Sequence, residues 1–258
     1  MTPTQIFTSF LTIIRKEITR FLRIWPQTLV PPAITQSLYF LIFGTFIGSR
    51  IGEVGGVDYM EFIIPGLIMM SVITSSFNNV VSSFFGSRFQ KNLDEILVSP
   101  TPNWVIIAGF TGGGVLRGLL VGLIVFAVSL GFNPDVRIDN IFVVLFFIVI
   151  TAILFSLGGL TNGIFAKKFD DVAIFATFIL TPLTYLGGVF YSLNQLPDFW
   201  RAVSVINPIV YMVDGFRAGF SGQSEFGILL DAGLVLLAVV ILAGINWYLL
   251  RRGVGIKQ

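Results

Sequence analysis

The stretch FQKNLDEILVSPTP, residues 89–102, separates two long apolar runs with a short charged segment. Its charged side chains are Lys91, Asp94 and Glu95. At helical spacing its apolar side chains form one stripe, made of Phe89, Leu93, Ile96 and Leu97. Pro100 and Pro102 end such a helix, because proline lacks the backbone donor that a helix interior needs. The stretch therefore predicts an amphipathic helix at residues 88–100, held between two longer apolar segments.

The composition of the rest of the chain places this segment in a membrane protein. Of 258 residues 55% are hydrophobic and 12% are charged, and the mean hydropathy is +0.88. A soluble domain cannot hide that much apolar surface. The chain has no Cys and no His, which excludes thiol chemistry and the commonest zinc sites. The net charge of +2 implies no nucleic-acid partner.

The apolar runs outside this stretch predict six transmembrane helices, because a spanning helix needs roughly 20 apolar residues. The predicted spans are residues 29–48, 62–85, 104–130, 141–165, 172–190 and 227–250. We therefore expect an all-α polytopic membrane protein that forms a single domain over residues 1–258.

Residues 1–26 precede the first span and predict an amphipathic helix at the membrane interface. Thr2 and Gln5 have the spacing of a capping box, with Pro3 at the first helical position. Apolar side chains from Ile6 to Trp25 fall on one face, and most basic side chains fall on the other. A basic face of this kind suits a lipid headgroup surface. The alternative is a helix that packs as in a soluble protein.

The distribution of basic residues orients the spans. If the N-terminus is cytoplasmic, most Lys and Arg residues fall on the cytoplasmic side, the C-terminal tail included. The exceptions outside the spans are Arg50, Arg137, Arg201 and Arg217. An odd number of spans would place the basic tail outside. The bias therefore predicts both termini, and the helix at 88–100, in the cytoplasm.

The segment at residues 197–222 is too apolar for an exposed loop and too charged for a seventh span. Asn207-Pro208 interrupts it, since proline biases its predecessor away from helix. We expect two short helices on the extracytoplasmic side, dipping into the outer leaflet or lying along it. The residues that define this broken segment are Pro197, Trp200, Asn207, Pro208, Asp214 and Arg217.

Three polar side chains within the predicted spans are candidates for a translocation path: Asn78, Asn79 and Arg117. Such groups are costly in lipid, so they face a water-filled path or bond to neighbouring helices. The two asparagines fit both interpretations equally. The Gly-rich run TGGGVLRG at 111–118 lacks the Lys-Ser/Thr of a phosphate loop and favours close helix packing.

A family resemblance lies near the carboxyl end, in LPDFWRAVSVINPIVYMVDGFR at 196–217, preceded by TPLTYLGGVFYSL at 181–193. Together with the order of the spans, these motifs make the chain resemble the membrane subunit of ABC-2 type export systems, in particular the YadH-like bacterial inner-membrane permeases. The similarity runs through essentially the whole chain. The carboxy-proximal motif is fairly specific, whereas the first spans are not.

The resemblance implies a homodimeric export permease of the bacterial inner membrane that is not itself an enzyme. Two copies of a separate ATPase subunit would bind ATP and magnesium, and this chain would bind no cofactor. The absence of a phosphate loop agrees with that division. In such systems a coupling helix docks on the ATPase, and the matching residues are Phe89, Lys91, Leu93, Asp94, Glu95, Ile96, Leu97 and Pro100. A second inner loop, AKKFDD, adds weaker candidates for the same contact: Lys167, Lys168, Asp170 and Asp171.

Other functions fit the sequence less well. A helix at 88–100 lying on lipid headgroups is the simplest alternative to coupling, but Asp94 and Glu95 oppose an anionic inner leaflet. A secondary transporter or channel typically needs carboxylates within its spans, and here the acids fall in loops or near span ends. A membrane enzyme would need converging catalytic groups, and the spans offer none. The sequence does not select a substrate.

Overall fold

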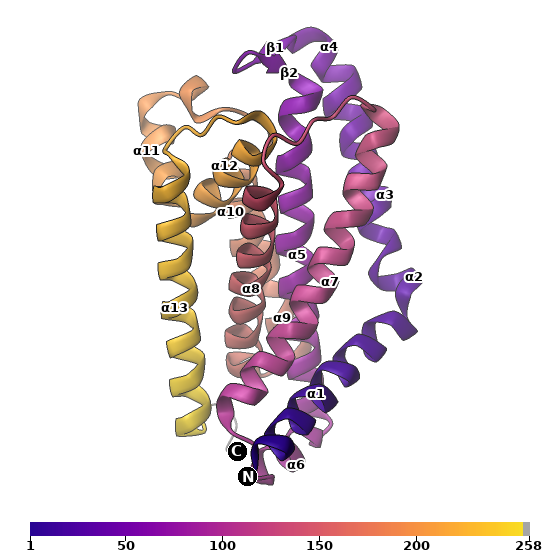
Figure 1. The fold of residues 1–258 in the computed structure, drawn as a ribbon, viewed down its shortest axis with the longest axis vertical. Helices are drawn as coiled ribbons and strands as arrows, with labels where there is room; N and C mark the ends of the chain where they lie inside the picture. The colour runs from indigo at the N-terminus through magenta and orange to yellow at the C-terminus, as the bar shows by residue number, and fades with distance from the viewer. Residues whose placement is uncertain (255–258) are drawn as a thin grey trace.

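The computed structural model describes residues 1–254, apart from the side chains of Asp94 and Leu97, and is almost entirely helical (Figure 1). Within this range the strands are β1 (Glu53–Val54) and β2 (Val57–Asp58), which form a small antiparallel hairpin. We call the end of the bundle that carries this hairpin the outer end. The opposite end, where the N-terminus and the carboxyl end of the described residues lie, is called the inner end (Figure 1).

Residues 3–51 form a helix, an elbow and a long helical run. Helix α1 (Pro3–Arg23) begins with the capping box that the sequence predicts, since Gln5 N donates to Thr2 Oγ1 and Thr2 N donates to Gln5 Oε1. Helix α2 (Trp25–Thr28) forms the elbow, where Thr28 Oγ1 donates to Phe21 O at 3.0 Å. Above it follow α3 (Val30–Tyr39), the π-helix η1 (Phe40–Ile47) and α4 (Gly48–Ile51).

The centre of the bundle is α5 (Tyr59–Phe89), which packs along α7 (Asn103–Phe132) and α8 (Ile141–Phe165). Glycine allows this close approach. A Cβ on Gly114 of α7 would lie 2.4 Å from Ser156 Oγ, and one on Gly159 of α8 would lie 2.5 Å from Phe77 O. The Gly-rich run at 111–118 therefore packs helices together, as the sequence suggests.

Five helical segments are long and apolar enough to cross a membrane. Within residues 1–254 they are Trp25–Ile51, Tyr59–Phe89, Asn103–Phe132, Ile141–Phe165 and Ile228–Arg252, the last being α13. The chain is therefore a helical membrane protein.

The structure differs from the prediction of a membrane span at residues 172–190. The chain there forms α9 (Phe169–Phe175), the π-helix η2 (Ala176–Leu180) and α10 (Thr181–Tyr185), with lengths of seven, five and five residues. At 1.5 Å per residue the run is about 25 Å long, whereas a hydrocarbon core is about 30 Å thick. It stops early because the chain turns at Gly187 and Gly188, where Gly188 has φ +73°. A six-span topology remains a prediction.

The segment before α13 contains a 3₁₀ turn, η3 (Leu193–Gln195), and the helices α11 (Asp198–Ile206) and α12 (Pro208–Ser221). Asn207 joins the two helices: its Oδ1 accepts from Ile209 N at 3.1 Å, and its Nδ2 donates to Leu183 O at 2.6 Å. Helix α12 packs among α5, α8 and α13. It is therefore surrounded by protein at the outer end, while α11 stays more exposed.

Candidate functional site

The charged segment at the inner end is a helix of seven residues, α6 (Asn92–Val98). The prediction of a helix over 88–100 was too long: Phe89 is the last residue of α5, and Lys91, with φ +62°, lies in the turn before α6. Leu93 is fully buried in an apolar cluster built by α1, α5, α7, α8 and α13. Glu95 is exposed, and the apolar Val98 is 87% exposed. The side chains of Asp94 and Leu97 lie outside the described part.

The second inner loop is held by the last two residues of α5, directly before the turn that leads to α6. Arg88 donates to Ile164 O at 2.6 Å, to Gly163 O at 3.3 Å, and to Ala166 O, which joins the end of α5 to the end of α8. The Phe89 ring lies 4.9 Å, between centroids, from the ring of Phe169 at the start of α9. The two inner segments therefore form one unit.

The charged residues of the second inner loop divide into two groups. Lys167, Lys168 and Asp170 are exposed. Asp171 accepts from Lys167 N at 2.8 Å and from Lys168 N at 3.0 Å, so it caps the start of α9. These two backbone hydrogen bonds lower the pKa of Asp171. Asp171 therefore shapes the loop, and the other three are free to meet a partner surface.

A buried polar cluster joins α1 to α5. Glu17 is fully buried, 3.0 Å from Lys16 Nζ and 3.3 Å from Arg20 Nη2, and it accepts from Ser83 Oγ at 2.6 Å. Arg20 Nη2 also donates to Asn79, at 2.9 Å to the backbone O and 2.7 Å to Oδ1. Asn79 is thus a contact between helices. Its partner is Arg20, which in turn is held by Glu17. Glu17 was not predicted as part of this cluster, although it lies on the apolar face between Ile13 and Phe21.

Arg117 of α7 holds the elbow of the N-terminal segment. Its Nη2 donates to Thr28 O at 3.3 Å. Its Nε is buried and has no hydrogen-bond partner among residues 1–254. Arg117 therefore bonds to a backbone carbonyl, one of the two roles expected for it, and keeps spare donor capacity.

An exposed polar stripe marks one face of α5, a helix that is otherwise buried: Thr74 is half-buried, and Asn78 and Ser82 are exposed. The hydroxyls of Thr74 and Ser82 bond to their own helix, at 2.9 Å to Met70 O and 2.6 Å to Asn78 O. The Asn78 amide makes no hydrogen bond in the described part of the chain. An amide left unpaired against lipid is costly. The Asn78 amide is therefore expected to contact water or another protein surface.

The neighbours of Asn78 place the stripe between two elements. Phe77 stacks on Phe175 of α9, with ring centroids 5.4 Å apart, and Asn79 bonds to Arg20 of α1. Successive helical residues point 100° apart, so Asn78 points between these contacts and away from the bundle core. Elsewhere the first span contacts α10 through Tyr39 and Tyr185, whose hydroxyls lie 2.6 Å apart.

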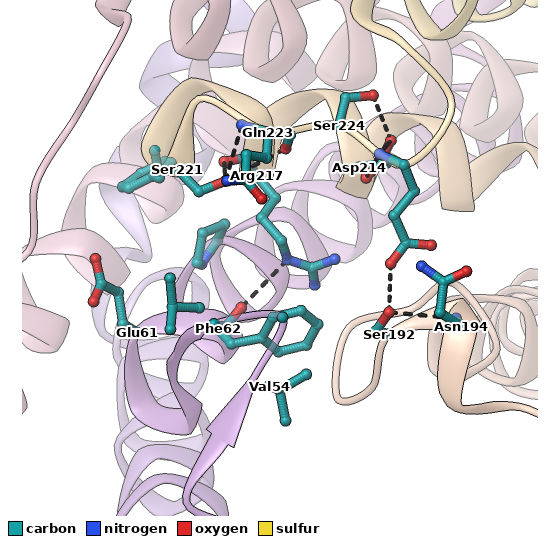
Figure 2. A pocket seen from close by; sticks show the side chains of 16 residues that line it. Val54, Glu61, Phe62, Ser192, Asn194, Asp214, Arg217, Ser221, Gln223 and Ser224 are labelled. Carbon is teal, nitrogen blue, oxygen red and sulfur yellow. Dashed lines mark hydrogen bonds between the residues drawn. The ribbon is translucent and has the colours of Figure 1, made fainter.

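At the outer end a chamber of about 390 Å³ brings together Asp214 and Arg217 of α12, the start of α5 and the loop after α12 (Figure 2). Arg217 Nη2 donates to Gly188 O at 2.7 Å, and the guanidinium lies 3.9 Å from the centroid of the Phe62 ring. Asp214 accepts from Ser224 Oγ at 2.8 Å and from Glu225 N at 2.9 Å. Ser224 and Glu225 come from loop sequence with no motif that would have predicted them.

The remaining residues of the broken segment lie elsewhere. Pro197 precedes α11, and Trp200 is 49% exposed with its ring against Phe199. Asn207 and Pro208 make the helix break. Residues 1–254 contain no group of three His, Cys, Asp or Glu side chains placed to hold a metal ion.

Comparisons with known proteins agree on one family. The model of the ABC-2 type transporter family matches residues 8–221. The chain is 57% identical over 243 residues to the inner membrane transport permease YadH of Escherichia coli (strain K12), which covers 94% of each chain. It is 24% identical over 218 residues to nodulation protein J of Rhizobium leguminosarum bv. viciae, covering 83% of each chain. It is 25% identical to nodulation protein J of Rhizobium meliloti (strain 1021), covering 83% of this chain and 82% of the relative.

Proposed function

The chain belongs to the ABC-2 type transporter family, and from that premise we propose that it is the permease subunit of an ABC exporter. It moves a substrate out of the cytoplasm or the inner leaflet. A separate nucleotide-binding subunit hydrolyses ATP, with magnesium, and this chain binds neither. The membrane is the bacterial inner membrane, by likeness to the permease of Escherichia coli, and both termini face the cytoplasm.

The observation that supports this proposal most is that α6 is anchored in the bundle on one face and exposed on the other. It lies between the two longest spans and is anchored by Leu93 in a cluster to which five helices contribute. Its other face leaves Glu95 and Val98 exposed. A force applied to α6 therefore moves the inner ends of α5 and α7 together, as a coupling helix must. Through Arg88 and Phe169 the same force reaches α8 and α9.

The stripe on α5 supports a homodimer with a shared path. One copy leaves Asn78 unpaired on an open face between α1 and α9, and a second copy in twofold arrangement covers that face. A polar stripe on each side of the twofold axis would then line a water-filled passage. Two ATPase subunits follow from the same symmetry.

Thiol labelling tests the passage, because the chain has no cysteine of its own. N78C is compared with V240C, which stands on α13 where Val240 is 67% exposed. We expect a water-soluble maleimide to modify N78C about tenfold faster, since thiols react as thiolates and these form only in contact with water. Reaction of N78C as slow as that of V240C would contradict a water-filled path along α5.

Purification of the tagged chain from its native membrane tests whether a separate ATPase subunit binds to it. We expect a subunit that carries a phosphate loop to co-purify in equal amount, and the complex to hydrolyse ATP. If transport instead depends on a proton gradient and persists without ATP, the chain is a secondary transporter and the proposal is wrong.

A further inference from the structure

Loop 222–227, between α12 and α13, is held by two buried carboxyl groups. Asp214 of α12 is 3% exposed and Asp231 of α13 is fully buried. Ser224 Oγ lies 2.8 Å from Asp214 Oδ2 and 3.1 Å from Asp231 Oδ2, so one hydroxyl bridges both helices. Figure 2 shows Ser224 beside Asp214 at the rim of the outer chamber. The connection through Asp231 is not explained by transport of a substrate.

Counting hydrogens at Ser224 shows that the bridge needs one more proton. A serine hydroxyl has one hydrogen to donate and two lone pairs that accept. Asp214 Oδ2 also accepts from Glu225 N at 2.9 Å, which suits an ionised carboxylate and makes it the acceptor of the Ser224 hydrogen. One lone pair of Ser224 Oγ accepts from Gly227 N at 2.7 Å. The other faces Asp231 Oδ2, and two acceptors repel unless one of them carries a proton.

The surroundings of Asp231 favour its neutral form. Its Oδ1 is buried and has no hydrogen-bond partner among residues 1–254. The charged and titratable groups near it on α12 and the loop are engaged elsewhere. Arg217 donates to backbone carbonyls, Tyr211 donates to Val205 O, and Glu225 accepts from Ser192 Oγ. A carboxylate at Asp231 would thus be buried beside the negative Asp214 without a cation.

We propose that Asp231 is a proton-binding site, held as a neutral carboxylic acid that donates to Ser224 Oγ and thereby fastens loop 222–227 to α12 and α13. Loss of that proton turns the contact into a repulsion between two acceptors and adds a second buried negative charge. The loop is then released from α13. The loop is therefore held at lower pH and released as pH rises.

Labelling at Gln223, which is exposed in this loop, measures its release. Q223C in the purified chain is reacted with a maleimide, and D135C in another exposed outer loop serves as the reference. Both thiols ionise as pH rises, so the ratio of the two rates reports the loop alone. An aspartate in water is fully ionised throughout the range from about pH 6 to about pH 9. We expect the ratio of the two rates to rise about fivefold over this range, because Asp231 loses its proton there.

The matched variant is D231N, whose amide donates to Ser224 Oγ at every pH. In Q223C/D231N we expect the ratio to stay constant. An equal rise with and without D231N, or no rise in either, would overturn the proposal. Should D231N fail to fold, infrared difference spectra of the unmutated chain decide. A protonated carboxyl band near neutral pH that disappears in alkali supports the proposal, and absence of that band overturns it.

Discussion

Replacing Val98 by aspartate is expected to abolish most transport and transport-stimulated ATP hydrolysis, while the chain still inserts and folds normally. Val98 is 87% exposed on α6, so a charge there disturbs no contact within the chain. An exposed apolar side chain is the kind of residue that anchors a docking contact such as the one we propose for α6. Loss of such an anchor costs about 2 kcal/mol or more, which lowers affinity by roughly thirtyfold.

Reversal of Glu95 to arginine on the same helix tests the charge of this surface, and we expect a smaller loss. D135R is the matched control, since it makes the same kind of reversal in an exposed loop at the outer end. Rates of ATP hydrolysis in proteoliposomes, normalised to protein inserted, give the comparison. Equal activity of V98D, D135R and the unmutated chain would show that α6 does not carry the coupling.

Removing the carboxylate of Glu17 is the change with the largest expected effect on stability. Glu17 is fully buried and holds Lys16, Arg20 and Ser83, and through Arg20 it fixes Asn79 of α5. Breaking a buried ion pair costs about 3–5 kcal/mol, and E17A should lie at the lower end because Lys16 and Arg20 are partly exposed. The ion pairs and the Ser83 hydrogen bond through which Glu17 connects α1 to α5 would then be lost.

The melting temperature of the purified chain measures this effect, and we expect a fall of about 10 °C for E17A. R15A is the control on the same helix, because Arg15 is exposed and its removal should change the melting temperature little. E17Q keeps the shape and the Ser83 contact and should lie between the two. A melting temperature for E17A within a degree or two of that of R15A would show that the cluster contributes little.

Features set by local chemistry could be predicted from the sequence. The apolar runs mark the long helices, and the break between α11 and α12 follows from Asn207-Pro208, since proline cannot continue the preceding helix. The capping box at Thr2 and the packing role of the glycines at 111–118 likewise depend on residues close in sequence or on backbone size.

Features set by contacts between distant segments could not be predicted. Phe89 has the spacing of the α6 stripe, but it packs on Phe169 as part of α5, and only the tertiary fold decides between the two. The early end of α10 depends on the turn at Gly188. Glu17 left one signal, an acid on an apolar helical face between Ile13 and Phe21. Its basic partner Arg20 follows within one turn, but its contact on α5 does not follow from the sequence.

A cross-link from α6 to the subunit that hydrolyses ATP would test directly whether α6 connects the permease to an ATPase. A photoreactive residue is placed at position 98 in one sample and at position 135 in another, and each tagged chain is irradiated in its native membrane. We expect position 98 to capture a protein with a phosphate loop and position 135 not to capture one. Capture of lipid alone at position 98, in a sample that still transports, would contradict this expectation.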